Sequence, residues 1–223
     1  ACMWVKTVVS RAHYNGLIPR NPFAQFRITP NVKEREYLTE REIRQLIEHE
    51  FSDAMLAFTR DLFVFACFTA LSFADIRELT ADEIMDVNGE KWIISKRHKT
   101  GVPFQVKLLD IPLQIIGKYR PFQKDNSVFG EINYWNVCKK LKKVISECGI
   151  NKQISFHCSR HTFGTLALSK GMPIESVSRV LGHTNIKTTQ IYAKITTQKL
   201  GNDLTAFSNQ LNQTFGNIKV AGI

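Results

Sequence analysis

Five side chains between residues 99 and 192 have the types and spacing to act on a phosphate together. His157 and Arg160 are three residues apart, which places them on one face of a helix. His183 opens a later helical pattern, and Tyr192 lies nine residues further on, about two and a half turns along and close to the face below it. Lys99 lies in a loop between two predicted strands. Alone, each of these residues is typical of packing or of a solvated surface.

Together, these residue types suit the attack of a tyrosine on a phosphodiester. A free tyrosine has a pKa of about 10 and is a poor nucleophile at neutral pH, but nearby cations and a hydrogen-bond acceptor would activate it. Arginine and histidine can bind the non-bridging phosphate oxygens and stabilise the transition state. A lysine can protonate the leaving alkoxide. This scheme needs no metal and no cofactor, and the alternative is that Tyr192 simply packs.

Composition indicates a folded protein with an affinity for a polyanion. Hydrophobic residues make up 43% of the 223 residues, enough for a buried core. The net charge of +10 is uneven: residues 91–200 hold 19 Lys or Arg against five acids, a balance of +14, and the rest of the chain balances at −4. This asymmetry favours one face turned toward nucleic acid, although a merely soluble basic surface is the alternative.

Membrane and secreted classes are not favoured. No uninterrupted apolar run approaches about 18 residues, so we expect no membrane span. The five cysteines are odd in number and form no CxxC pair, and Cys67 and Cys148 lie among apolar residues as small core side chains, which favours a reducing, cytoplasmic setting. The chain has neither a signal-peptide pattern nor an initial Met, so we expect a fragment of a longer protein.

Periodicity predicts an α+β fold that is mostly α-helical. A capping box, Thr39 with Glu42, begins a helix whose apolar stripe is Ile43, Leu46 and Ile47. The predicted helices cover residues 3–18, 38–51, 53–70, 73–80, 134–149, 156–171, 173–182 and 186–195, and residues 28–36 form a polar linker. A weakly helical tail follows, with an apolar stripe formed by Leu200, Leu204, Phe207 and Leu211.

A small antiparallel sheet is predicted within the helical domain. Asn88-Gly89 between two apolar runs is a strong hairpin signal over residues 83–95, and residues 104–109 form a third strand. The loop between the second and third strands carries Lys96, Arg97, His98 and Lys99.

Two motifs resemble those of the tyrosine recombinases, the phage and transposon integrases. "HCSRHTFGT" resembles their HxxRHTFAT box, and "LGHTNIKTTQIY" resembles their LGHxxxxTTxxYxH box. "KRHKTGVPFQV" is similar to their lysine-bearing β-hairpin, and "LTEREIRQLIEH" to the usual start of the catalytic domain. The resemblance covers about residues 36–195. It implies that residues 1–30 are the C-terminal end of a core-binding (SAM-like) domain, 31–36 a linker, and 37–223 the catalytic domain with its C-terminal tail.

The resemblance also implies a function and partners. Tyr192 would attack the scissile phosphate, form a 3′-phosphotyrosyl bond and release a 5′-hydroxyl, which on a partner strand would reverse the attack without ATP. Such an enzyme integrates or excises a mobile element. Its partner is double-stranded DNA at specific sites, which it binds as a homotetramer on paired sites, with a DNA-bending protein as an optional accessory.

Residue roles follow from the matched motifs. Arg160 would take the role of the second arginine, His157 that of the first histidine of HxxR, and His183 the His/Trp position. Lys99 would be the general acid. His161 matches the second histidine of the box and is interpreted as structural.

One position departs from the family pattern. Members usually have an arginine in a "TGLRxSEL"-like box, and here Ser72 stands in its place within "TALSFADIREL". This resembles the integrases of conjugative transposons, in which a serine is common there. Arg97 is the favoured replacement because the strand period puts it on the face of Lys99, and Arg77 is the weaker candidate, turned about 140° from Ser72. Ordinary solvation of Arg97 is the alternative.

Three other functions remain open. A non-enzymatic regulator could use residues 174–194 as a DNA-binding helix-turn-helix. A metal hydrolase could use His157, His161 and His183, although the glutamate of HExxH is missing and Arg160 beside a cation is unfavourable. A type IB topoisomerase shares the tyrosine chemistry, but it would relax supercoils without pairing two sites.

Overall fold

The structure is a computed structural model that describes residues 2–26, 36–98, 101–119, 125–192 and 197–215. The chain divides into two units, residues 1–34 and 35–223. The predicted domain boundaries at residues 30 and 36 fall in or beside the stretch 27–35, which is outside the described residues, so they stay predictions.

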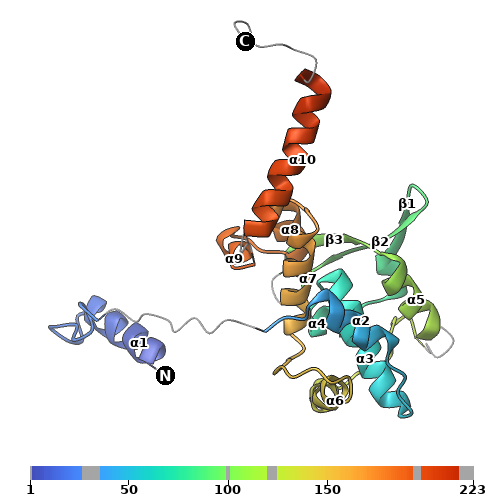
Figure 1. Cartoon of the computed structure of the whole chain (residues 1–223). Coiled ribbons are helices and arrows are strands. Elements are labelled where there is room, and N and C mark those ends of the chain that lie inside the picture. The colour runs from blue at the N-terminus through green and yellow to red at the C-terminus, as the bar shows by residue number, and fades with distance from the viewer. Residues whose placement is uncertain (1, 27–35, 99–100, 120–124, 193–196, 216–223) are drawn as a thin grey trace, which may run out of the picture. The chain divides into compact units, whose positions relative to one another are not determined.

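The helices are α1 (Cys2–Tyr14), α2 (Glu40–Glu48), α3 (Ala54–Thr69), α4 (Phe73–Glu78), the 3-10 helix η1 (Ala81–Glu83), α5 (Asp110–Tyr119), α6 (Tyr134–Glu147), α7 (Cys158–Ser169), α8 (Ile174–Leu181), α9 (Lys187–Gln190) and α10 (Thr197–Phe215). The strands are β1 (Ile84–Val87), β2 (Glu90–Lys96) and β3 (Pro103–Lys107), so the predicted α+β, mainly helical fold is confirmed (Figure 1).

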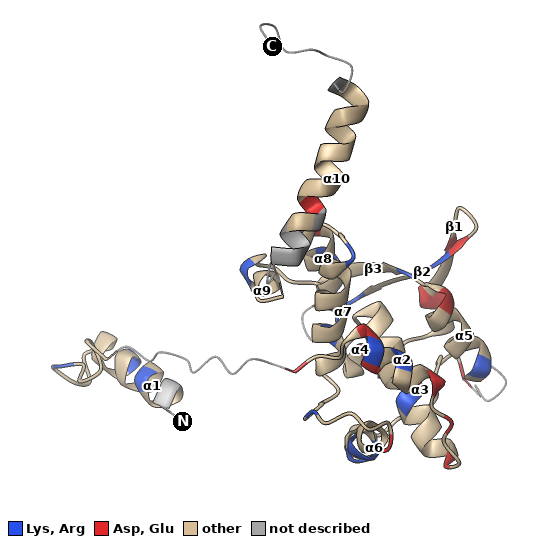
Figure 2. Ribbon diagram, viewed as in Figure 1, with Lys and Arg blue, Asp and Glu red and all other residues tan. Residues whose placement is uncertain are grey.

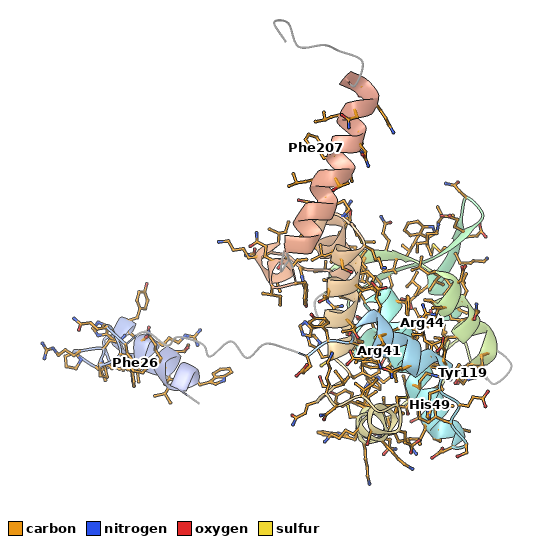
Figure 3. All side chains as sticks on the ribbon, in the orientation of Figure 1. Phe26, Arg41, Arg44, His49, Tyr119 and Phe207 are labelled. Atoms are coloured by element: carbon orange, nitrogen blue, oxygen red, sulfur yellow. The ribbon has the colours of Figure 1, made fainter. Side chains whose placement is uncertain are left out.

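The first unit is α1 with a returning tail. The helix ends at Tyr14, and Pro19 and Pro22 lie in the irregular segment that follows. Lys6 Nζ donates to the carbonyl of Phe26 at 2.6 Å, which ties this segment back to the helix. Phe26 is labelled in Figure 3. The side chain of Trp4 is 77% exposed, so α1 presents an apolar surface within the described residues of its unit.

Helix α3 is the centre of the second unit. Asp53 caps its N-terminus by accepting from the Met55 N–H at 2.7 Å, as the predicted start requires. A helix that is apolar on all sides must be buried, and Leu62, Phe63 and Phe65 are 0% exposed. Helices α2, α5, α6 and α7 pack around it. Each fully buried Leu or Phe contributes about 1.5–3 kcal/mol, so this packing holds the two ends of α3 in place.

The charged pair inside α3 consists of the buried Asp61 and the partly buried Arg60. Asp61 accepts from Lys118 Nζ and from the Tyr119 hydroxyl, both at 2.6 Å, and so joins α3 to α5. Arg60 Nη1 donates to three backbone carbonyls at the end of α2, among them that of His49 at 2.9 Å. His49 and Tyr119 are labelled in Figure 3. Arg60 and Asp61 therefore form a polar junction between α2, α3 and α5.

Two details of the helical prediction were wrong. The capping box of Thr39 and Glu42 begins α2 as expected, but Ile47 is 36% exposed and does not join the buried stripe. Helix α5 was not predicted, because its sequence contains Pro112 and Gly117. Pro112 lies in the first turn, where its missing N–H breaks no intrahelical bond, and Ile115 is buried.

The sheet has the predicted hairpin. Asn88 and Gly89 have φ values of 56° and 81°, the positive angles that a tight type I′ turn needs. The strand order is β1-β2-β3 with antiparallel pairing, and Ile93 on the central strand is 0% exposed. β3 packs against α8, so the sheet lies beside this later helix (Figure 1).

A second, smaller core joins α7 and α8. Phe163, Leu168, Val177 and Leu181 form it with Ala70, and Tyr192 packs against it. On α10 the predicted stripe is exposed at Leu204 (58%), Phe207 (57%) and Leu211 (40%), whereas the side chain of Leu200 is outside the described residues. None of the helices described is long and apolar enough to cross a membrane.

Candidate active site

Two arginine side chains meet at the C-terminal end of α3. Ala70 ends this helix in the left-handed conformation (φ 56°), and its carbonyl accepts from Arg97 Nη1 (3.5 Å) and from Arg160 Nη1. The Nη2 atoms donate to carbonyls at the end of α8, that of Arg97 to Val180 and that of Arg160 to Leu181. The carbonyl ends of helices carry partial negative charge, which stabilises both cations at this point.

Asp75 ties Arg97 to the beginning of α4. Its Oδ2 accepts from Arg97 Nη1 and from the Ser72 hydroxyl, both at 2.8 Å, and its Oδ1 accepts from the His98 N–H at 3.0 Å. Arg97 and Asp75 are 6% and 8% exposed, so they form a buried ion pair. Burial alone would raise the pKa of Asp75, but these three donors hold the pKa below its usual value. Asp75 is therefore ionised and fixes the guanidinium of Arg97.

Ser72 caps a helix at the position where the family pattern has an arginine. Its side chain accepts from the Asp75 N–H at 3.3 Å and completes a capping box. Of the two replacement candidates, Arg97 lies beside Arg160, and the alternative that it is merely solvated is wrong. Arg77 instead forms a surface ion pair with Glu78 at 2.8 Å, in which both side chains are about half exposed.

Electrostatic effects connect the arginines to two histidines. Burial and, after it, the nearby charge of Arg97 lower the pKa of Arg160 to about 10. Burial also lowers the pKa of His183 to about 4, and Arg160, Arg97 and His157 act in the same direction. His183 is therefore neutral at pH 7. The structure thus brings Arg97 together with His157, Arg160 and His183, the three residues that the motifs pointed to.

Tyr192 lies in the same cluster. Its ring centroid is 5.2 Å from that of His161 and 6.5 Å from that of His183, with the latter two rings nearly parallel at 18°. It is also within electrostatic range of Arg160. On another side the ring approaches Gly164 so closely that a Cβ built there would be 2.8 Å from the ring Cδ2. Glycine in the interior of α7 therefore provides the space for this ring.

The predicted helical relation of His183 and Tyr192 was wrong. His183 does not open α9, because it follows Gly182, which has φ 65° and ends α8. Tyr192 lies beyond the end of α9, and its N–H donates to the Thr189 carbonyl at 3.0 Å. A Cβ on Gly182 would be 3.0 Å from Arg97 Nε, so glycine satisfies both the backbone and the space. Tight turns, and not one continuous helix, place the two rings together.

The remaining predicted residues have different outcomes. His157 is the exposed residue at the start of α7, with its ring 4.9 Å from that of His161. His161 is 3% exposed, in keeping with the structural role expected of it. Lys99 is outside the described residues, so its role stays a prediction. In the part of the chain that the structure describes, no group of three or more His, Cys, Asp or Glu side chains is placed to hold a metal ion.

Sequence reasoning missed three members of this site. Asp75 had a usable signal, because Ser72 and Asp75 have the spacing of a capping box. Gly164 also had one, because it stands where the HTFAT pattern has an alanine. Gly182 was visible only as an ordinary helix end, since its contact with Arg97 joins residues that are 85 positions apart.

Comparison with known proteins finds similar sequences. The family model described as the phage integrase family matches residues 36–199. The tyrosine recombinase XerA of Saccharolobus solfataricus is 32% identical over 139 residues, which cover 61% of this chain and 47% of the relative. The XerA of Pyrococcus horikoshii is 32% identical over 136 residues, covering 56% of this chain and 47% of that protein. The chain thus spans about half the length of the curated relatives it matches.

Solved structures share the fold. The Tn1549 transposon integrase in complex with circular intermediate DNA superposes with a TM-score of 0.72 at 17% identity, over 89% of this chain and 75% of the integrase. The XerA recombinase superposes with a TM-score of 0.61 at 21% identity, over 82% of this chain and 69% of the recombinase. At these identities the likeness establishes the fold alone.

Proposed function

Because the chain belongs to the phage integrase family, we propose that it is the catalytic part of a tyrosine recombinase, which breaks and rejoins DNA at specific sites through Tyr192. The observation that carries this proposal is the position of the Tyr192 ring beside His183 and within electrostatic range of Arg160. A tyrosine near a cation such as Arg160 loses its proton more readily, which makes it a better nucleophile.

In the proposed reaction the Tyr192 oxygen forms a bond to the scissile phosphorus as the bond to the 5′ oxygen breaks. The phenol proton passes to water, and Lys99 supplies a proton to the leaving 5′ oxygen. The products are a 3′-phosphotyrosyl link and a free 5′-hydroxyl. Attack by a 5′-hydroxyl of a partner strand reverses these bond changes, so the bond energy is conserved and no ATP is consumed.

Arg160 and Arg97 are proposed to bind the non-bridging oxygens of this phosphate. In the described part of the chain the Arg97 Nε atom is buried and has no hydrogen-bond partner, and a phosphate oxygen would supply an acceptor. Two guanidiniums beside the phosphorus stabilise the negative charge of the pentavalent transition state. Arg97 would thereby replace the arginine that is missing at Ser72.

The wider function is proposed on the same basis. The substrate is double-stranded DNA at specific sites, bound by a homotetramer on paired sites, with a DNA-bending protein as an optional accessory, and the reaction takes place in the cytoplasm. Exposed lysines on α6, coloured blue in Figure 2, add to the basic charge that would attract a polyanion. Ser72, typical of conjugative-transposon integrases, favours integration or excision of a mobile element.

A suicide-substrate assay tests the central step. The full-length protein would be incubated with nicked duplexes taken from the junctions of the element that encodes it, and covalent protein–DNA complexes would be separated on a denaturing gel. Wild type should form the complex, and Tyr192→Phe should not, because only the nucleophilic oxygen is removed. Tyr37→Phe is the matched control, since the exposed Tyr37 ring lies over Lys152 and phenylalanine keeps that contact. Covalent complex formed by Tyr192→Phe at the wild-type rate would overturn the proposal.

The open alternatives have separate tests. A type IB topoisomerase would relax a supercoiled plasmid that carries one site, whereas a recombinase needs two paired sites. A metal hydrolase would lose activity in EDTA and regain it with zinc or magnesium, but the arginines around His183 repel such a cation. A helix-turn-helix regulator is not favoured, since α9 has only four residues and is too short for a recognition helix.

A further inference from the structure

Thr189 is the buried residue of a short, otherwise exposed segment. It is 0% exposed, whereas its neighbours Thr188 and Gln190 on α9 are exposed. Its Oγ1 lies 2.8 Å from His183 Nδ1, and its backbone carbonyl accepts from the Tyr192 N–H at 3.0 Å. One residue therefore contacts both the histidine and the chain that carries the tyrosine.

We propose that Thr189 is a positioning residue, whose hydroxyl sets the tautomer of His183 while its carbonyl fixes the start of the turn that presents Tyr192. This inference rests on the proposed function, because it concerns the same site. Thr189 is not proposed to touch DNA, and it acts through the two side chains that do.

The direction of the hydrogen bond follows from burial. A hydroxyl that only accepted from Nδ1 would leave its own hydrogen without an acceptor, which is costly in a fully buried position. Among the residues that the structure describes, His183 Nδ1 is the hydrogen-bond partner of this hydroxyl. We therefore assign Thr189 Oγ1–H as the donor and Nδ1 as the acceptor.

This assignment fixes what His183 offers to a substrate. The ring is neutral at pH 7, because burial and the nearby arginines hold its pKa at about 4. A neutral imidazole carries one proton, so an accepting Nδ1 leaves the proton on Nε2. Nε2–H is then a donor to a non-bridging phosphate oxygen, which gains negative charge in the transition state. The opposite tautomer would place a lone pair there and repel that oxygen.

The contact also sets the distance between the two rings. Thr189 accepts from the Tyr192 N–H, and its side chain is fixed against His183, so the backbone between them has little freedom. The near-parallel rings at 6.5 Å reflect this constraint. Loss of the hydroxyl should thus loosen the ring of His183 more than the fold, since the methyl group of the threonine stays in place.

Three variants of the full-length protein separate the hydroxyl from the packing. Thr189→Val keeps the shape and removes the donor, Thr189→Ser keeps the donor, and Thr188→Val is the control at the exposed neighbour. Covalent cleavage of the junction duplexes and DNA affinity would be measured for each. We expect Thr189→Val to slow cleavage by about 10-fold or more with little change in affinity, Thr189→Ser to retain most of the rate, and Thr188→Val to match wild type.

A second readout does not depend on cleavage. Nitrogen-15 NMR of histidine-labelled protein at pH 7, with His183→Gln to assign the signals, reports which ring nitrogen carries the proton. We expect the Nε2–H form in wild type and in Thr189→Ser, and a mixture of tautomers in Thr189→Val. If wild type carries the proton on Nδ1, or if Thr189→Val keeps both the tautomer and the rate, the proposal is wrong. If Thr189→Ser is as defective as Thr189→Val, the methyl group matters and the hydroxyl does not. Because the tautomer is observed without DNA, an absence of covalent cleavage in wild type would count against the proposed function alone.

Discussion

Replacing Gly164 by alanine tests whether the Tyr192 ring rests against α7 as the structure places it. Gly164 is buried in the interior of this helix, where alanine is normally the better residue. A Cβ at this position would lie 2.8 Å from the ring Cδ2 and 3.0 Å from two further ring carbons. Carbon atoms pack best at about 3.5–4.0 Å, so the ring would have to retreat by roughly 0.7 Å.

Two opposing effects determine the size of the change. Alanine in place of glycine stabilises a helix by about 0.5–1 kcal/mol. Overpacking against the ring costs about 1–3 kcal/mol. With Tyr192 present, Gly164→Ala should therefore leave the free energy of unfolding unchanged or lower it by up to about 2.5 kcal/mol. With Tyr192→Ala, the same change should raise it by about 0.5–1 kcal/mol, because the obstacle is gone.

Urea unfolding of the four proteins of this double-mutant cycle measures the coupling, which we expect at about 1–3 kcal/mol. Gly117→Ala is a matched control: Gly117 lies within α5, and a Cβ there meets nothing within 4 Å. It should stabilise both backgrounds equally. If Gly164→Ala behaves like Gly117→Ala whether or not Tyr192 is present, the ring does not rest on Gly164 and the geometry of the nucleophile is wrong.

Three further predictions concern charged groups. Arg97→Ala should slow covalent cleavage by about 100-fold or more and lower the free energy of unfolding by about 3–5 kcal/mol, because Asp75 loses its buried partner. Arg97→Lys should stay folded and still cleave slowly. Arg77→Ala should lower the free energy of unfolding by less than about 1 kcal/mol and should cleave well, because its ion pair is on the surface. A folded Arg97→Ala protein that cleaves normally would remove Arg97 from the site. The pKa of His183 falls from 6.5 to about 4 on folding, so the unfolded chain binds more protons between these values, and the stability that the neutral ring contributes is present above pH 6.5 and is lost as the pH falls to about 4. Urea unfolding between pH 4.5 and 7 should show this loss in wild type and a smaller loss in His183→Gln, whereas equal pH dependence would contradict it. Lys99→Ala should slow cleavage of an ordinary phosphodiester far more than of one with a 5′-thio leaving group, which needs no proton, and equal defects would exclude the general-acid role.

Local signals explain which elements were predictable. The capping box at Thr39, the Asn88-Gly89 turn and the apolar run of α3 each depend on residues close in sequence, and the structure has all three. Helix α5 was not predicted, because proline and glycine usually interrupt helices. In the first turn, however, proline removes no intrahelical hydrogen bond. The early end of α9 and the exposure of Ile47 depend on tertiary packing, which no local pattern reports.

The sequence could predict most residues of the site, but not the contacts that hold them in place. The motifs pointed to His157, Arg160, His183 and Tyr192, and the strand period put Arg97 on the face of Lys99, a residue outside those that the structure describes. The period could not predict that Arg97 is buried, because its partners Asp75 and Val180 lie 22 and 83 residues away in the sequence. Asp75 and Gly164 had local signals, but the contacts through which they act join residues distant in the sequence, as does that of Gly182.

The capping role of Ser72 bears on how this site can change over generations. The serine caps α4 and donates to Asp75, which in turn holds Arg97. An arginine restored at position 72 would lose a cap that contributes about 1 kcal/mol and would add a third guanidinium beside two others. Loss of Arg97 first would instead leave Asp75 buried without its partner. Positions 72 and 97 are therefore entrenched as a pair: a lineage with this serine returns to the usual arginine by single substitutions only through a less stable protein.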